Sequence, residues 1–249
     1  MVKEQRLDHI LTVLKGSEMV TYELLAQSLK VSEDTIRRDI DILHKNGLLS
    51  KVRGGAILRS RNPLTFQDRS SYLKKGKDVI ALKAQQFVKN GQTIFMDGGT
   101  TICAVATQFP FNAHFRVVTN NQALVPILAK NKGIEIVVLG GVYNRDTETN
   151  VGTRTCQEVS MYVADAYLMG ACAADPNHGI TARIREDGDV KQSMMNAALK
   201  TIVLSNHEKL NHHDFFKVCD LASVDVLVTD LPSEDKRLDL FRNKEILIV

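Results

Sequence analysis

Seven short apolar runs separated by helical stretches constrain the fold of this chain more than any other feature. The runs are rich in β-branched residues, and they cover residues 93–96, 116–119, 135–139, 166–169, 201–204, 224–228 and 246–249. Helical patterns lie between most of them, over residues 77–89, 101–108, 122–130, 155–162 and 189–199. Strands that are apolar throughout and alternate with helices predict a mostly parallel sheet covered on both faces, which is an α/β fold.

The first 58 residues follow a different, mainly helical pattern. Amphipathic helices are predicted over residues 7–14 and 21–29, and a third helix begins after Ser32, whose hydroxyl can cap it. The third helix carries one apolar stripe, formed by Ile36, Ile40 and Leu43. Because only Lys30 and Val31 separate the second helix from this cap, the pair is predicted to be a helix-turn-helix.

A hairpin is predicted after the third helix. Asn46 and Gly47 end the helix, and residues 48–58 read as two short strands around Arg53, Gly54 and Gly55. Such a hairpin would form a wing beside a DNA groove, so we expect a winged helix-turn-helix domain over residues 1–58. A linker is expected over residues 59–65, and an α/β domain over residues 66–249.

The charge of the chain is concentrated in the same region. Residues 1–61 hold 11 Lys and Arg against 8 Asp and Glu, whereas the remaining residues hold 21 of each kind. From residue 42 to residue 61 there are basic residues and no acidic one. A basic helix end, wing and linker would neutralise DNA phosphates. The alternative is a small helical domain with an ordinary solvated face.

Residues 3–58 resemble the DNA-binding domain of the DeoR family of bacterial transcription regulators. The resemblance is carried by Val31-Ser32-Glu33, by Thr35-Ile36-Arg37-Arg38-Asp39 and by the wing glycines Gly54-Gly55. It implies double-stranded operator DNA as a partner. The residues expected at the DNA are Tyr22, Ser32, Thr35, Arg37, Arg38, Lys51 and Arg53. Phosphate repels a carboxylate, so we expect Asp39 to orient an arginine or to tie the helix to the wing.

Ligands of parallel α/β sheets bind beyond the carboxyl ends of the strands. Several glycine-rich and polar segments of this chain are predicted to lie there, and Asp97-Gly98-Gly99-Thr100-Thr101 could hold a phosphate at a helix N-terminus. The alternative for each glycine pair is an ordinary strand-to-helix turn. The expected effector-binding residues are Asp97, Gly98, Gly99, Thr100, Thr101, Asn120, Gly140, Gly141, Lys191 and Lys209.

The DeoR resemblance extends over residues 66–230 to an effector-sensing domain related in fold to ribose-phosphate isomerase. It implies a phosphorylated sugar, or a related metabolite, as the effector of a repressor of sugar or carbohydrate metabolism genes. Two positions depart from the family pattern. Cys172-Ala173 stands where the family usually has Asp-Gly, and Asn206 stands where it usually has Asp. Because both changes remove carboxylates that acid–base catalysis would need, we expect no enzyme activity.

Two alternatives remain open for the second domain. It could be a sugar-phosphate isomerase-like enzyme, or it could only assemble the regulator or bind a protein partner. We expect no cofactor and no metal, although a histidine cluster at residues 207–214 could also be read as a metal site rather than a solvated loop. The four cysteines are expected to be buried free thiols. The protein is expected to be cytoplasmic and homo-oligomeric, without a membrane partner.

Overall fold

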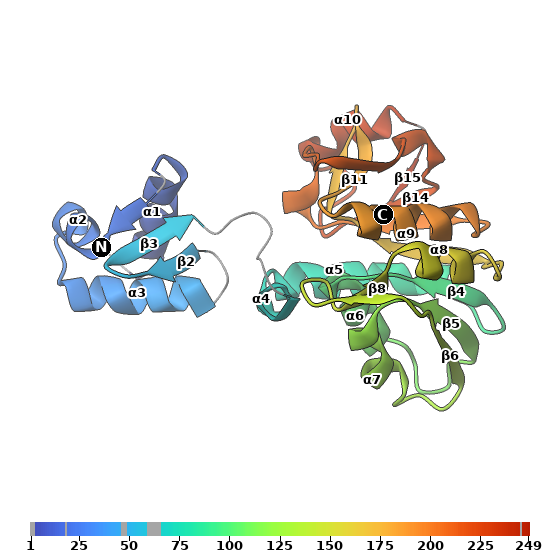
Figure 1. Cartoon of the computed structure of the whole chain (residues 1–249). Coiled ribbons are helices and arrows are strands. Elements are labelled where there is room, and N and C mark those ends of the chain that lie inside the picture. Colours follow the sequence, from blue (N-terminus) through green and yellow to red (C-terminus); the bar gives the residue numbers. More distant parts are fainter. Residues whose placement is uncertain (1–2, 18, 46–48, 59–65, 245) are drawn as a thin grey trace. The chain divides into compact units, whose positions relative to one another are not determined.

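The chain divides into two compact units, residues 1–74 and residues 75–249. The structure is a computed structural model (Figure 1), and it describes residues 3–17, 19–45, 49–58, 66–244 and 246–249. The linker predicted at residues 59–65 lies outside the described residues. The division falls after Lys74, so the short helix α4 (Phe66–Ser71) belongs to the N-terminal unit.

The N-terminal unit contains the predicted helices and hairpin. Its elements are α1 (Lys3–Lys15), β1 (Met19–Thr21), α2 (Tyr22–Leu29), α3 (Glu33–Lys45), β2 (Leu49–Val52) and β3 (Gly55–Leu58). The strands form an antiparallel sheet in the order β1-β3-β2. Strand β1 was not predicted, since three residues are too few to show an alternating pattern.

The turn between α2 and α3 is tight because Lys30 adopts a left-handed conformation, with φ 52°. The amide of Val31 then donates to the Ala26 carbonyl at 3.1 Å, which ends α2. The predicted stripe of α3 is confirmed, since Ile36, Ile40 and Leu43 are all buried in one cluster with α1 and α2.

The C-terminal unit is built on a seven-stranded parallel sheet, as the sequence predicts. In spatial order its strands are β15 (Leu247–Ile248), β14 (Val226–Val228), β12 (Thr201–Leu204), β9 (Ala166–Gly170), β4 (Thr93–Met96), β5 (Phe115–Thr119) and β6 (Ile134–Val138). Each of the seven predicted runs overlaps one of these strands, and the bounds differ by at most two residues at either end.

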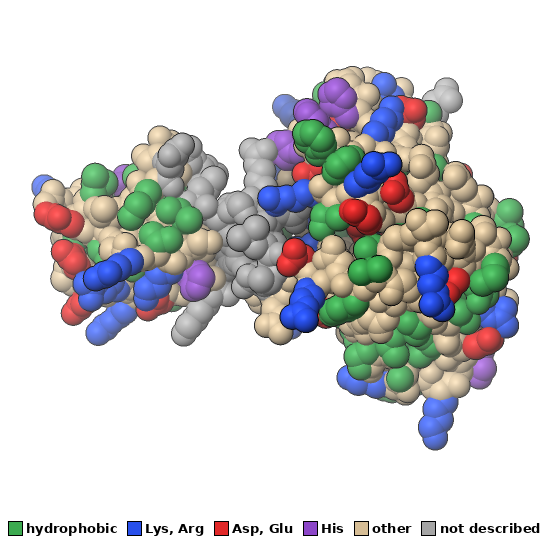
Figure 2. All heavy atoms as spheres, viewed as in Figure 1, with side chains coloured by type: hydrophobic (Ala, Val, Ile, Leu, Met, Phe, Trp, Pro, Cys, Tyr) green, Lys and Arg blue, Asp and Glu red, His purple; other side chains and the backbone are tan. Residues whose placement is uncertain are grey.

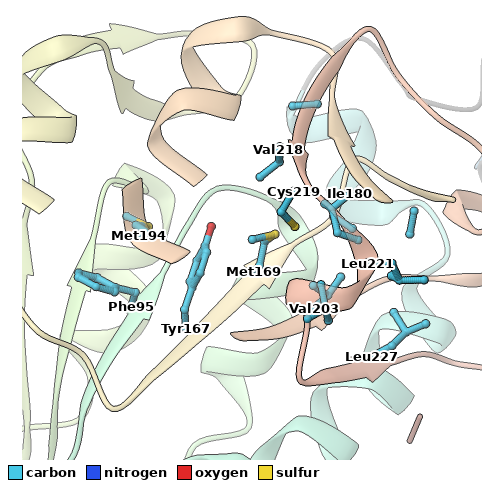
Figure 3. Close-up of a cluster of buried hydrophobic side chains, with 14 of the residues drawn as sticks. Phe95, Tyr167, Met169, Ile180, Met194, Val203, Val218, Cys219, Leu221 and Leu227 are labelled. Carbon is cyan, nitrogen blue, oxygen red and sulfur yellow. The ribbon is translucent and has the colours of Figure 1, made fainter. Parts of the chain in front are cut away.

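Helices cover both faces of the sheet (Figure 1). The helices are α5 (Lys74–Ala84), α6 (Thr100–Thr107), α7 (Val125–Leu128), α8 (Thr153–Val159), α9 (Arg185–Asn196) and α10 (Asp239–Arg242). Helices α5 to α7 contribute to one buried cluster, and α8 to α10 contribute to the other. Successive strand residues alternate between the clusters, so Phe95 and Tyr167 face α9 while Ile94 and Leu168 face α5 and α6. Figure 3 shows the Tyr167 ring standing among apolar side chains of its cluster.

Two small antiparallel sheets were not predicted. One pairs β7 (Val142–Asn144) with β8 (Thr149–Val151), and the other has the order β10 (Ala173–Asp175), β11 (Gly179–Ala182), β13 (Phe216–Cys219). These strands have three or four residues and several contain Ala, Asn, Asp or Gly, which have low strand propensity. Among the described helices, none is long and apolar enough to span a membrane.

Candidate functional site

The N-terminus of α3 is built as the sequence predicts. The amide of Thr35 donates to Ser32 Oγ at 3.3 Å, which caps the helix, and the two hydroxyls of these residues lie 2.9 Å apart. Outside the buried stripe, Arg37 and Arg38 are exposed, and Thr35 is half-buried. The arginines are therefore placed on the accessible side of the helix that a DNA groove could receive.

Tyr22 does not project from the surface. Its side chain is 7% exposed, and its ring lies beneath Arg37, with 5.3 Å between the guanidinium carbon and the ring centroid. Arg37 Nη2 also lies 3.6 Å from Glu33 Oε2, one helical turn earlier. The structure thus gives Tyr22 a contact with Arg37, and a direct contact of Tyr22 with DNA stays a prediction.

The wing is tied to α3. Lys51 Nζ on β2 lies 2.6 Å from Asp41 Oδ1 on α3, and this hydrogen bond raises the pKa of Lys51. Arg53 is exposed beside Gly54, which turns the hairpin with φ +85°. Gly55 is needed for a different reason, because a side chain there would meet the Val20 carbonyl.

Asp39 orients an arginine, as one of the two predicted alternatives states. Its carboxylate accepts hydrogen bonds from Arg6 Nε at 2.7 Å and Arg6 Nη2 at 3.2 Å, and its side chain is 3% exposed. The pair joins α1 to α3, and Asp41 makes the contact with the wing instead. Figure 2 shows basic and acidic side chains close together where α3 lies in Figure 1.

The second candidate site lies where the strand order of the large sheet reverses. From β4 the chain adds β5 and β6 on one side and then returns to place β9 on the other. Such a switch point leaves a crevice beyond the carboxyl ends of the two central strands. Asp97 follows β4, and Gly170 ends β9, so these residues meet at the switch point.

Asp97 is the centre of a buried polar network. Its side chain is 1% exposed and accepts hydrogen bonds from the Gly170 amide at 2.8 Å, the Tyr167 hydroxyl at 2.5 Å and Lys191 Nζ at 2.6 Å. Lys191 also lies 3.5 Å from Asp187 Oδ2, one turn earlier on α9. The network joins β4, β9 and α9. The predicted residues Asp97 and Lys191 are therefore brought together, but their charged groups bind each other and not an open site.

Asp187 is a site residue that the sequence analysis missed. From sequence, the acidic run of Glu186, Asp187 and Asp189 is most simply a capped helix start, yet Asp187 is buried and the N-cap of α9, Ile184, makes no side-chain hydrogen bond. The signal for its role is its spacing from Lys191, since residues four apart on a helix can form an ion pair.

Burial and charge shift the pKa values of this network. Burial raises the pKa of Asp97, and the charge and hydrogen bond of Lys191 oppose that shift. Burial also disfavours the ammonium form of Lys191, but the carboxylates of Asp187 and Asp97 outweigh it and hold the pKa of Lys191 above its ordinary value. Burial and the Asp97 carboxylate raise the pKa of Tyr167, so its hydroxyl remains a hydrogen-bond donor.

The two glycines after Asp97 have different reasons to be glycine. A side chain on Gly98 would collide with Thr149, whereas Gly99 has φ +117° and, apart from its chain neighbours, no described residue within 4 Å of the position a Cβ would take. Gly99 precedes α6 as its N-cap without a side-chain hydrogen bond. Thr100 and Thr101 begin α6 and are largely buried. The space beside Gly99 and the helix N-terminus could accept an anion.

Within the described part of the chain, two asparagine side chains near the strand ends leave an amide oxygen buried without a partner. Asn120, after β5, donates to the Asn150 carbonyl at 2.8 Å, and its Oδ1 has no hydrogen bond. Asn206, after β12, is 4% exposed and its Oδ1 is also unpartnered. Each oxygen could accept a hydrogen bond from a ligand hydroxyl.

Gly140 and Gly141 pack against α8. The amide of Gly140 donates to Glu158 Oε2 at 2.6 Å, and a side chain on Gly141 would meet Thr155 Oγ1. The Gly140 amide and Arg154 lower the pKa of Glu158. These glycines therefore have internal partners, and their contact with an effector stays a prediction.

Lys209 lies next to this network, at the residues that follow β9. Its Nζ donates to the Ala171 carbonyl at 2.5 Å, one residue after β9. Burial raises the pKa of the neighbouring Cys172 thiol, on which the charges of Lys191, Asp187 and Lys209 also act. Cys172 Sγ lies 3.9 Å from Asp187 Oδ2. Lys209 and Lys191 thus lie near a common thiol.

The remaining candidates have ordinary partners. Among the described residues, no group of three or more His, Cys, Asp and Glu is placed to hold a metal ion. His207 instead lies 2.6 Å from Asp230 Oδ2. All four cysteines are free thiols, as expected, but Cys219 alone among them is fully buried while the other three are half-buried.

Family models match both parts of the chain. The DeoR-like helix-turn-helix domain matches residues 6–62, and the DeoR C terminal sensor domain matches residues 74–231. A solved structure with a similar arrangement is ribose 5-phosphate isomerase A from Methanocaldococcus jannaschii, with a TM-score of 0.41 and 15% identity over 55% of this chain and 54% of that chain.

Curated relatives match over nearly the whole length. The HTH-type transcriptional repressor GlcR of Bacillus subtilis is 33% identical over 94% of this chain and 91% of that protein. The lactose phosphotransferase system repressor of Lactococcus lactis is 31% identical over 97% of this chain and 96% of that protein. The glycerol-3-phosphate regulon repressor of Escherichia coli is 27% identical over 93% of this chain and 92% of that protein. The chain therefore belongs to the DeoR family and is a DNA-binding transcription regulator, not an enzyme.

Proposed function

We propose that this regulator represses sugar or carbohydrate metabolism genes and is released by a phosphorylated sugar bound in the crevice between β4 and β9. The observation that carries the proposal is the open space beside Gly99, at the uncapped N-terminus of α6 and at the switch point of the sheet. The relatives named as repressors of lactose phosphotransferase and glycerol-3-phosphate systems support this ligand class.

The phosphate would lie at the start of α6, where the amides of Thr100 and Thr101 face an anion and the helix dipole favours it. The hydroxyl groups of the sugar would reach the unpartnered oxygens of Asn120 and Asn206. Lys209 supplies a nearby positive charge. Asp97 and Lys191 would hold the crevice in shape, since their charges are already paired.

On DNA, α3 would enter the major groove and the wing would contact the phosphate backbone. A homo-oligomer formed through the second unit would bind two half-sites spaced by one helical turn, about 34 Å, or a multiple of it. The effector would shift the population of domain arrangements and weaken operator binding. A regulator of this kind would act in the cytoplasm, where bacterial DNA is found.

The test begins with operator fragments selected from random duplex DNA by the full-length protein. Glucose 6-phosphate, fructose 6-phosphate and ribose 5-phosphate are then added to the protein–DNA complex and, separately, to the protein in a thermal-shift assay. The unphosphorylated sugars and inorganic phosphate are the controls. We expect one sugar phosphate to raise the melting temperature and to release DNA.

The variants Thr100→Val and Lys209→Met should lose the response to that sugar phosphate and keep operator affinity in its absence. If no sugar phosphate stabilises the protein while operator binding is intact, the second unit serves assembly or binds a protein partner instead. Turnover of a sugar phosphate by the purified protein would contradict its assignment as a regulator alone.

A further inference from the structure

The two arginines of α3 differ in how they are held. The Arg37 guanidinium lies over the Tyr22 ring at 5.3 Å and beside Glu33 at 3.6 Å. Arg38 is exposed, and no described residue holds its side chain. Arg37 therefore has two neighbours that favour one orientation of its guanidinium in the free protein, and Arg38 has no such neighbour among the described residues.

A fixed guanidinium suits base recognition. An arginine reads guanine by donating two parallel hydrogen bonds to O6 and N7, and this geometry requires the guanidinium plane to be aligned with the base. A guanidinium held over the face of an aromatic ring has fewer orientations to lose on binding, which lowers the entropy cost of the contact. Glu33 engages Nη2 of Arg37, so the rest of its fork remains available to a base. A phosphate contact needs no such alignment.

We propose that Arg37 reads a guanine in each operator half-site, that Tyr22 and Glu33 are its positioning residues, and that Arg38 makes a phosphate contact. Tyr22 is suited to this role because it comes from α2, outside the reading helix, and its buried ring gives Arg37 a rigid support. The packing of α2 against α3 thereby fixes the direction of the reading arginine.

Glu33 should also affect how well the protein distinguishes the operator from other DNA. Its side chain is 48% exposed at the start of the helix that would enter the groove. Its carboxylate repels phosphates wherever the helix approaches DNA, and it holds Arg37 back from a phosphate contact. At a site with the matching guanine, Arg37 can bind the base and keep Glu33 as its neighbour. Glu33 is therefore expected to weaken binding to non-operator DNA more than binding to the operator.

The experiment uses the full-length protein and an operator selected from random duplex DNA. Each base pair of one half-site is replaced in turn, and affinities are measured for the wild type, Arg37→Ala, Arg38→Ala, Tyr22→Leu, Tyr22→Phe and Glu33→Gln. The wild type should lose about 5- to 150-fold in affinity when the guanine is replaced, and Arg37→Ala should be indifferent to that replacement. Arg38→Ala should weaken binding to every sequence and reduce the salt slope by about one.

The positioning role is tested by the other three variants. Tyr22→Leu should reduce the preference for the guanine by about 2- to 5-fold, and Tyr22→Phe, which keeps the ring, should retain it. Glu33→Gln should bind random-sequence DNA more tightly and discriminate less at the same base pair. If Tyr22→Leu does not fold, Glu33→Gln decides, because this exposed substitution does not disturb the core.

The inference is overturned if Glu33→Gln and Tyr22→Leu change the affinity for all sequences by one common factor, or if the base pair sensitive to Arg37→Ala is not G·C. It rests on operator binding by α3, which the proposed function shares. Unchanged operator affinity in both Arg37→Ala and Arg38→Ala would refute that shared interface, whereas an intact Arg37 effect without the Tyr22 and Glu33 effects refutes this inference alone. Both sets of affinities are measured without effector, so they do not depend on whether the second unit binds a sugar phosphate.

Discussion

Replacing Lys191 by methionine removes the cation that lies between two buried carboxylates. Lys191 Nζ is 2.6 Å from Asp97 Oδ2 and 3.5 Å from Asp187 Oδ2, and the three side chains are 2%, 1% and 7% exposed. Breaking one buried ion pair costs about 3–5 kcal/mol. Because Lys191→Met leaves two carboxylates facing each other, we expect the loss in unfolding free energy to reach about 5 kcal/mol.

For a domain of this size, that loss corresponds to a fall in melting temperature of about 10–20 °C. Calorimetry of the full-length protein measures it, and amide hydrogen exchange of β4 and β9 locates it in the second unit. Asp97→Asn should cost less, since Lys191 keeps Asp187. The double variant Asp97→Asn/Lys191→Met should cost less than the sum of the two single changes, because it removes opposite charges together.

A matched control lies on the same helix. Arg185 and Asp189 form an exposed pair at 3.8 Å, so Arg185→Ala should change the unfolding free energy by less than about 1 kcal/mol. The difference in unfolding free energy between the wild type and Lys191→Met should also become smaller as the pH falls, because protonation of one carboxylate relieves the repulsion between the two. Two results would refute the view that the network is a coupled buried unit. One is a loss of unfolding free energy in Lys191→Met no larger than that in Arg185→Ala. The other is a loss in the double variant equal to the sum of the losses in Asp97→Asn and Lys191→Met.

Three further outcomes can be measured directly. Gly55→Ala should unfold the wing, because the new Cβ would collide with the Val20 carbonyl of β1, whereas Gly54→Ala should cost only about 1 kcal/mol for its left-handed backbone; thermal melts compare them. Burial raises the pKa of Cys103 and of Cys219 to about 11, so in native protein both thiols should resist iodoacetamide at pH 7.5 and react only in denatured protein, as peptide mass spectrometry can show. The pKa of Glu158 is lowered by its hydrogen bond from the Gly140 amide, so its stabilisation is present at neutral pH and is lost as the pH falls through that lowered pKa; Glu158→Gln should flatten the acid side of the stability profile.

The order of strands and helices could be predicted because each central strand is apolar on both faces. The run Thr93–Met96, for example, places Phe95 in one buried cluster and Ile94 in the other, so its neighbours must cover both sides. The cap at Ser32 was predictable for a local reason, since the hydroxyl and the amide it binds are three residues apart. The small sheets were not predictable, because β7 and β10 have three residues each and no alternating pattern.

The partners of the charged side chains could not be predicted from the sequence. Asp97 and Lys191 are 94 positions apart, and their contact depends on the packing of α9 against the sheet. The same holds for Tyr22 and Arg37, which meet because α2 packs on α3. Sequence identified which residue types gather at the strand ends, but tertiary packing decides whether a charge faces a ligand or another side chain.

The two departures from the family pattern have a common electrostatic meaning in this structure. Cys172 Sγ lies 3.9 Å from Asp187 Oδ2, so an aspartate at position 172 would place a third carboxylate beside Lys191. Burial raises the pKa of Cys172, which keeps the thiol neutral near pH 7. Asn206 likewise presents a neutral oxygen after β12. Both replacements remove negative charge from the edge of the sheet that Lys209 reaches, and a less negative edge favours an anionic effector over a neutral one.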